Sequence, residues 1–140
     1  MRVHKVSPED WKPLSELAHS AVFKEHKPSD WDRIDFVLTV EEDDGKPRGY
    51  VTCRELDAKT LYWQFGGAFP DTQNSIAAFR GYQNFARWSK DRYDRVCTYI
   101  ENTNSPMLKM AAKIGFVIVG VRNFKGSVLL EHLLEFSEVN

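Results

Sequence analysis

The stretch that decides the fold of this chain is CTYIENTNSPMLKMAAKIGFVIVGVRNFKGSVLLEHLLEF, residues 97–136. A strand pattern ends before Asn104, a one-sided helix pattern follows, and Gly115 with Phe116 opens an apolar strand pattern. A second strand pattern follows, at residues 128–136. This order is a way of building a cleft between two strands and lining it with a helix N-terminus, so we expect a binding site in this third of the chain.

The residues before this stretch predict further strands and helices. Ser7 is an N-cap candidate with Pro8 at the first helical position, and Gly66-Gly67 predicts a bulge or a close approach to the backbone. The apolar and polar residues alternate in residues 34–41, which is typical of a half-buried strand. The predicted elements are a strand at 3–6, a helix after Ser7, strands at 34–41, 48–56 and 60–69, and a long helix after Gln73. The apolar stripe of the long helix consists of Ile76, Phe79, Tyr82, Phe85, Ala86 and Trp88.

The element order is therefore β-α-β-β-β-α-β-α-β-β, which predicts a mixed α/β (α+β) sheet in a single domain over residues 1–140. The run at residues 116–121 is almost wholly apolar, which predicts a central strand covered on both faces.

Composition limits the function classes. The net charge of −1 gives no general attraction to nucleic acid or to an anionic membrane. No apolar run approaches the roughly 20 residues that span a bilayer, and the first residues lack the apolar core of a signal peptide. Cys53 and Cys97 lie in strand patterns, so we expect buried thiols and a reducing cytoplasm. No paired Cys or His spacing predicts a metal site.

The C-terminal motif resembles the GCN5-related N-acetyltransferase (GNAT) superfamily. Asn104 is followed by the apolar Met107 at +3 and by Gly115-Phe116 at +11 and +12, as in that family. Gly120 and Arg122 are similar to the branch that acetylates protein N-termini. The resemblance implies a mostly antiparallel mixed sheet flanked by helices, and an enzyme that moves an acetyl group from acetyl-CoA to a primary amine of a small molecule or protein.

The resemblance also assigns the cofactor site. The family's pyrophosphate loop matches residues 73–78, where Gln73 and Ala78 fit the pattern and Ile76 replaces the first glycine. Backbone N–H groups at Ile76, Ala77 and Ala78 would hold the pyrophosphate of acetyl-CoA. The pantetheine arm and the thioester would lie along the following residues: Phe65, Gly66, Gly67, Ala68, Asn104 and Met107. The structural alternative is a plain helix N-terminus, with Asn104 acting only as an N-cap.

Two residues are candidates for proton transfer. Glu101, at the end of a strand, is placed to accept a proton from the attacking amine, or is a solvated strand-end carboxylate. His132 is either a hydrogen-bonded core residue or a proton shuttle facing the cleft. The tyrosine that many family members place seven residues after the Asn, as proton donor to the CoA thiolate, is Ala111 here.

The departures at Ile76 and Ala111 keep a second hypothesis open. In length and pattern the chain is similar to small GNAT-like proteins of bacteriophages with the same degenerate loop, some of which are virion-associated. The alternative is therefore a catalytically inactive structural or protein-binding module. It would reside in the host cytoplasm or in the virion, with a second copy or a virion protein as its partner.

Overall fold

The computed structural model describes residues 1–11, 33–68 and 75–136 of the chain. Its strands are β1 (Arg2–Val6), β2 (Phe36–Glu41), β3 (Pro47–Asp57), β4 (Thr60–Ala68), β5 (Arg95–Glu101), β6 (Val117–Phe124) and β7 (Ser127–Glu135). Its two full helices are α2 (Ser75–Lys90) and α3 (Ser105–Ile114), and residues 8–11 are also helical. The element order in these ranges is the predicted one, and the rest of the helix expected after Ser7 lies outside the described residues.

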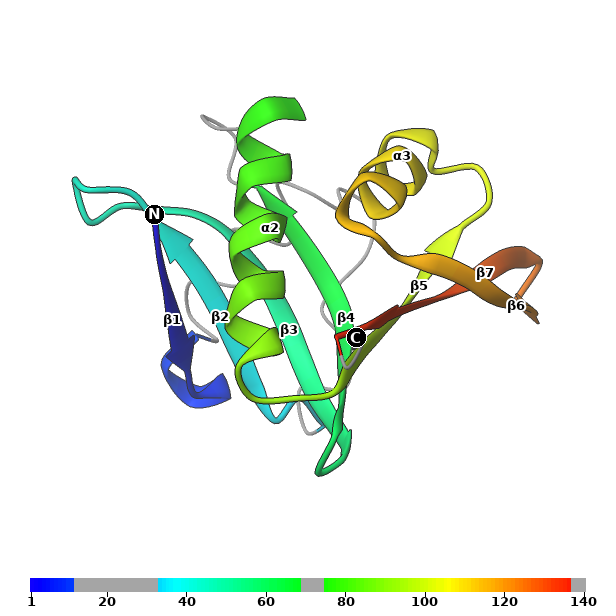
Figure 1. The fold of residues 1–140 in the computed structure, drawn as a ribbon, viewed down its shortest axis with the longest axis horizontal. Coiled ribbons are helices and arrows are strands. Elements are labelled where there is room, and N and C mark those ends of the chain that lie inside the picture. The colour runs from blue at the N-terminus through cyan, green and yellow to red at the C-terminus, as the bar shows by residue number, and fades with distance from the viewer. Residues whose placement is uncertain (12–32, 69–74, 137–140) are drawn as a thin grey trace.

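The strands form one seven-stranded sheet in the order β1-β2-β3-β4-β5-β7-β6. Every neighbouring pair is antiparallel except β4 and β5, which run parallel. Figure 1 shows β4 and β5 starting together and then separating, with α2 near one strand and α3 near the other. The predicted mixed α+β sheet is confirmed.

The main core lies between the sheet and the two helices. Leu61 and Val96 are fully buried at the start of β4 and β5, while Phe85 of α2 and Ala111 of α3 join the same cluster of buried side chains. Parallel strands that are covered by helices read as apolar runs, and this part of the sequence follows that rule. The core therefore holds α2 and α3 against the part of the sheet where β4 meets β5.

The second strand is covered on both faces, so the prediction of a half-buried strand was wrong. Val37 and Thr39 point away from α2, yet they are 0% and 5% exposed. Trp11 lies in the small cluster on that face, where its ring centroid is 5.4 Å from that of Tyr50. The polar residues of the alternating pattern misled the prediction, because Thr packs well inside a sheet.

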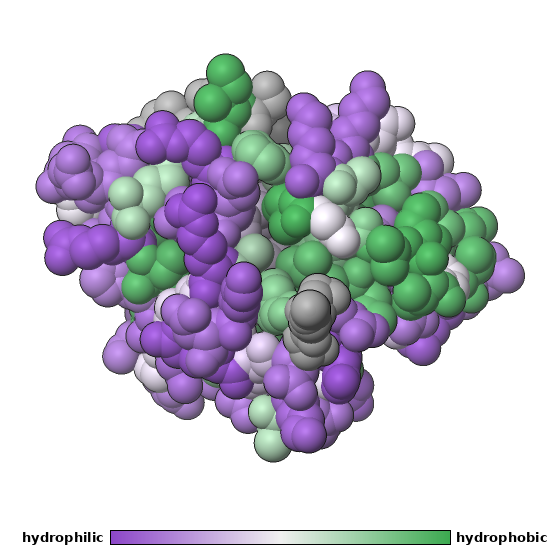
Figure 2. Space-filling view, in the orientation of Figure 1, coloured by the Kyte–Doolittle hydropathy of each residue, from purple (hydrophilic) through white to green (hydrophobic). Residues whose placement is uncertain are grey.

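The prediction of a central strand at residues 116–121 was also wrong, because β6 is the edge of the sheet. The side chains of Val117, Ile118, Val119, Val121 and Phe124 are 51–67% exposed. In the view of Figure 2, apolar surface gathers over α3 and the β6–β7 hairpin. An apolar run predicts that both faces of a strand are covered. Within the described residues β6 pairs with a neighbour along one edge only, and its apolar side chains stay exposed.

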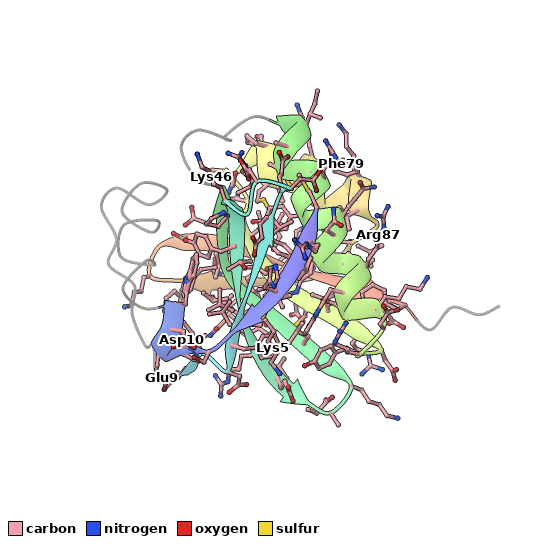
Figure 3. The ribbon with its side chains drawn as sticks, turned by 90° about the vertical axis from the view of Figure 1, so that its left-hand side faces the viewer. Lys5, Glu9, Asp10, Lys46, Phe79 and Arg87 are labelled. Carbon is pink, nitrogen blue, oxygen red and sulfur yellow. The ribbon has the colours of Figure 1, made fainter. Side chains whose placement is uncertain are left out.

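The two ends of the sheet are distinguished by their turns. Lys46, in the β2–β3 turn, lies at the same end of the molecule as Phe79 near the start of α2, whereas Glu9 and Asp10 lie at the other end (Figure 3). Arg87 lies further along α2. Within the described ranges, no helix is both long and apolar enough to cross a membrane.

Candidate active site

The site begins where β4 and β5 stop pairing. Their parallel register ends at the pair Trp63 and Thr98, although both strands continue beyond it. The Thr98 hydroxyl donates to the Trp63 carbonyl at 2.9 Å. A side-chain hydrogen bond therefore joins β4 and β5 at their last paired residues, and beyond this point the two strands no longer pair.

A bulge in β4 follows this point. Val51 pairs with Gly66 and Cys53 with Trp63, so Thr52 faces two residues of β4, Gln64 and Phe65. The Thr52 hydroxyl accepts from the Phe65 N–H at 3.1 Å and donates to the Phe65 carbonyl at 3.4 Å. Bulges re-aim side chains next to binding sites. The sequence predicted a bulge or a close approach at Gly66-Gly67; the bulge lies just before these glycines, which themselves pair regularly with β3.

Gly66 also marks a close approach to the backbone. A Cβ at this position would lie 2.5 Å from the Tyr82 hydroxyl oxygen and 3.1 Å from the Tyr50 carbonyl oxygen. The absence of a side chain at Gly66 lets the phenol of α2 reach the β4 backbone.

A cleft of about 440 Å³ opens between the separated strands. It is within the size range of small-molecule and cofactor sites. Its polar lining residues are Gln64, Thr98, Glu101 and Asn104. Its aromatic lining residues are Tyr62, Trp63, Phe65, Tyr82, Tyr99, Phe116 and Phe124. The cleft is thus a mostly apolar channel with a few polar groups, which is typical of ligand pockets.

The structure brings five of the predicted site residues together in this cleft: Phe65, Gly66, Glu101, Asn104 and Met107. Gly67, Ala77 and Ala78 line a separate cavity of only about 20 Å³ under α2, and Tyr82 lines both. Ala68 ends β4, and Gln73 lies outside the described residues. Ile76 is 72% exposed and lines neither space.

Ile76 does not belong to the apolar stripe of the long helix, which corrects the prediction. It is in the first turn of α2, beyond the part of the helix that packs on the sheet. Phe85, two and a half turns later, is buried as predicted. The N–H groups of a first helical turn have no acceptor inside the helix, and the helix dipole makes that end positive.

Asn104 and Glu101 lie together at the mouth of the cleft. The Asn104 side-chain oxygen caps α3 by accepting from the Met107 N–H at 3.4 Å, and the Asn104 N–H donates to the Glu101 carbonyl at 3.0 Å. Within the described residues the side-chain nitrogen of Asn104 makes no hydrogen bond. The cap predicted at Asn104 is confirmed, and its amide group still has a donor to offer a ligand.

His132 is a core residue rather than part of the cleft wall. It is 2% exposed, its Nδ1 lies 2.9 Å from the Leu130 carbonyl oxygen, and its ring is 6.4 Å from that of Phe116. Of the two interpretations that the sequence left open, the structure supports the buried one. Cys53 and Cys97 are buried free thiols, as expected.

Sequence reasoning missed two residues that shape the cleft, Tyr82 and Thr98. It assigned Tyr82 only to the apolar stripe of the long helix and gave Thr98 no role. The sequence signal that could have found Tyr82 was a phenol within an apolar stripe, because the hydroxyl of a tyrosine inside a protein usually has a hydrogen-bond partner.

Burial raises the pKa of two tyrosines of the cleft, Tyr82 and Tyr62. Desolvation raises the pKa of Tyr82 well above its usual value, with a smaller contribution from Tyr50. Desolvation also raises the pKa of Tyr62, to which Cys97 and Tyr99 add. Both phenols therefore stay protonated at neutral pH. Across residues 1–11, 33–68 and 75–136, no three His, Cys, Asp or Glu side chains are grouped to hold a metal ion.

No family model and no curated protein sequence matches the chain. Solved structures do match it along almost its whole length. Mutant forms of the spermidine/spermine N-acetyltransferase SpeG from Vibrio cholerae superpose with a TM-score of 0.73 at 12% identity, over 97% of this chain and 95% of theirs. A chimera of the spermidine N-acetyltransferase SpeG from Vibrio cholerae and hSSAT gives 0.77 at 13% identity, with the same coverage.

A third match comes from the ribosomal-protein-S18-alanine N-acetyltransferase of Escherichia coli. It superposes with a TM-score of 0.74 at 10% identity, over 99% of this chain and 96% of that one. The chain thus has the GNAT fold, as the C-terminal motif predicted. At these identities the likeness concerns the fold.

Proposed function

We propose that the protein is an acyl-CoA-dependent N-acetyltransferase, which moves an acetyl group from acetyl-CoA to a primary amine of a small molecule or protein. The observation that carries the proposal is the cleft of about 440 Å³ between β4 and β5, which opens directly beyond the Trp63–Thr98 pair. The fold is shared with structures that are named N-acetyltransferases and act on chemically different amines. The cleft offers a narrow, mostly apolar channel, which suits a pantetheine arm.

The cofactor would enter along β4. Its pantetheine arm would lie against Phe65, Gly66 and the end of β4, with Asn104 and Met107 on the facing side. Its pyrophosphate would lie at the first turn of α2, at Ile76, Ala77 and Ala78, where the N–H groups and the helix dipole attract anions. Ile76 stands where the family pattern has a glycine. Its exposed side chain would keep the pyrophosphate from approaching this turn as closely as a glycine would allow.

The reaction would be a direct attack of the amine on the thioester carbon. Glu101, an exposed carboxylate at the cleft mouth, would take the proton from the amine, directly or through a water. The main contribution of the enzyme would be to hold the two reactants in line, which is a large effect by itself. His132, with its ring in the core, has no part in this scheme.

Thermal unfolding with and without acetyl-CoA tests the proposal. Acetyl-CoA at 100 times its dissociation constant should raise the free energy of unfolding by about 2.7 kcal/mol. Ile76→Glu should abolish the shift, because a carboxylate at the start of α2 repels the pyrophosphate. Val121→Glu is the matched control, since Val121 is also an exposed aliphatic residue but lies on β6. A wild-type protein that shows no shift would overturn the proposal.

One observation favours the competing function, a non-catalytic binding module such as a bacteriophage virion component. The exposed apolar side chains of β6 are typical of surfaces that meet a partner. The same unfolding experiment separates the two functions, because a module without the chemistry has no reason to bind acetyl-CoA.

A further inference from the structure

Tyr82 is the polar group that α2 directs into the cleft. Its ring is held by an edge-on contact with Phe85, at 5.9 Å between centroids and 83° between planes, and by Trp63 at 6.0 Å. Its hydroxyl lies at the backbone of Gly66, directly after the bulge of β4. Tyr82 is partly buried and lines the cleft, and its hydroxyl makes no hydrogen bond within the described residues. A group bound in the cleft can therefore be the partner of this hydroxyl.

Within the described residues, the side chains that α3 itself contributes to the cleft carry no hydroxyl group. Ala111 of α3 lines the cleft, is 2% exposed and carries only a methyl group. Two other tyrosines line the cleft, Tyr62 on β4 and Tyr99 on β5. Their rings pack edge-on against each other, with 5.7 Å between the centroids. The Tyr82 hydroxyl, by contrast, lies at Gly66, directly after the bulge.

We propose that the Tyr82 hydroxyl is the catalytic proton donor to the thiolate that leaves when the thioester is cleaved. The inference rests on the proposed acetyl transfer and names a residue of α2, not of α3, for this step. The geometric basis is the position of the hydroxyl at Gly66, where the pantetheine end would meet the bulge of β4.

The step balances as follows. The amine nitrogen forms a bond to the thioester carbon, and the tetrahedral intermediate collapses with cleavage of the carbon–sulfur bond. The sulfur takes the proton of the Tyr82 hydroxyl and leaves as the thiol of CoA. The proton that Glu101 took from the amine returns to the Tyr82 oxygen through water, so both side chains regain their starting protonation and the products are the acetylated amine and the thiol of CoA.

The environment of Tyr82 suits this role. Desolvation raises the pKa of its hydroxyl above the usual value, so the donor stays protonated at neutral pH. A buried tyrosinate would be costly, which favours rapid reprotonation within the same cycle.

Tyr82→Phe tests the proposal, with Tyr93→Phe as the matched control. Tyr93 donates its hydroxyl hydrogen bond to Glu55, outside the cleft. Thiol release from acetyl-CoA is followed with spermidine and with an alanine-initiated peptide as probe amines. Tyr82→Phe should lower kcat at least about 100-fold with the KM and dissociation constant of acetyl-CoA unchanged, and Tyr93→Phe should change neither.

A second readout does not need an acceptor. The thiol of bound CoA is titrated by the ultraviolet absorbance of its thiolate, with desulfo-CoA as the reference. A phenol that donates to sulfur stabilises the thiolate, so the pKa of bound CoA should be about one unit lower in the wild type than in Tyr82→Phe.

The outcomes separate the two proposals. If the wild type binds no acetyl-CoA, the proposed acetyl transfer fails, and the role of Tyr82 fails with it. If the wild type binds acetyl-CoA and Tyr82→Phe keeps its kcat and its bound-thiol pKa, only the role of Tyr82 is overturned. A Tyr82→Phe protein that loses acetyl-CoA binding and kcat together would also overturn it, because the residue would then position the cofactor only.

Discussion

The hydroxyl of Thr98 donates to the carbonyl of Trp63 at the last paired step of β4 and β5, with 2.9 Å between the two oxygens. One strand lends a side chain to the other at the point where the backbone ladder ends. The bond therefore marks the point where the two strands separate and the cleft begins.

The first prediction concerns this bond. Thr98→Val keeps the shape of the side chain but leaves the Trp63 carbonyl without its donor, so the free energy of unfolding should fall by about 1–2 kcal/mol. Thr98→Ser keeps the hydroxyl and should lose less. Urea unfolding of the three proteins measures the difference. A larger loss for Thr98→Ser than for Thr98→Val would show that the methyl group, not the hydroxyl, matters here.

The second prediction concerns Gly66 and Tyr82. Gly66→Ala should destabilise the protein by about 1–3 kcal/mol, because the new methyl group would lie 2.5 Å from the Tyr82 hydroxyl oxygen. In a Tyr82→Phe background the same substitution should be less harmful, although the Tyr50 carbonyl oxygen stays at 3.1 Å. A double-mutant cycle measured by thermal unfolding gives the coupling. Simple additivity of the two substitutions would contradict the close approach.

The third prediction compares an exposed valine of β6 with a buried valine of β5. Val121→Thr on β6 should change the free energy of unfolding by less than about 0.5 kcal/mol, because Val121 is 67% exposed. Val96→Thr on β5 should lower it by about 1–3 kcal/mol, because Val96 is fully buried and the new hydroxyl would lose its water. Both variants are measured by denaturant unfolding. A large loss at Val121 would place β6 inside the sheet.

The fourth prediction concerns the alkaline limit of stability. Burial, with a smaller contribution from Glu131, raises the pKa of Cys97 from 9.0 to about 11. The folded state thus favours the protonated thiol, so its contribution to stability is complete below pH 9 and is lost as the pH rises towards 11. The loss for one such group is about 1.4 kcal/mol per pH unit in that window.

Cys97→Ala checks this sign. The variant has no thiol to titrate at this position, so its free energy of unfolding should fall less steeply between pH 9 and 11 than that of the wild type. Cys53, whose pKa burial also raises, is unchanged in both proteins and serves as a common background. Identical slopes for the two proteins would refute the assignment to Cys97.

Periodicity predicted which segments form strands and helices, but not which side of each is covered. The apolar run that forms β6 has the residues of a central strand. The order of the strands in the sheet, β5-β7-β6, nevertheless leaves it at the edge. That order depends on β7 pairing with β5 over seven residues, a long-range contact that no local pattern encodes. The same limit explains why Thr39 seemed solvent-facing and is buried.

The candidate site was predictable where a local motif fixes the backbone. Asn104 caps α3, as predicted. Gly115 takes the left-handed conformation with φ of 118° after Ile114, a role that helix-terminus chemistry gives to glycine and that the prediction did not name. The position of the Tyr82 hydroxyl was not predictable, because it depends on a bulge in β4 and a glycine on a different element. His132 is a second example of this limit. Strand alternation places its side chain on one face of β7, but it does not tell whether that face meets the core or the cleft.

Amide hydrogen exchange with and without acetyl-CoA tests the central claim most directly, because it reports where the ligand binds as well as whether it does. Binding between the separated strands should slow exchange at Phe65, Gly66 and Gly67 of β4 and at Ile76 and Ala78 of α2. Exchange in the exposed edge β6 should be unchanged at residues 117–121. Unchanged exchange in β4 and α2 at saturating acetyl-CoA, or protection confined to β6, would contradict the account.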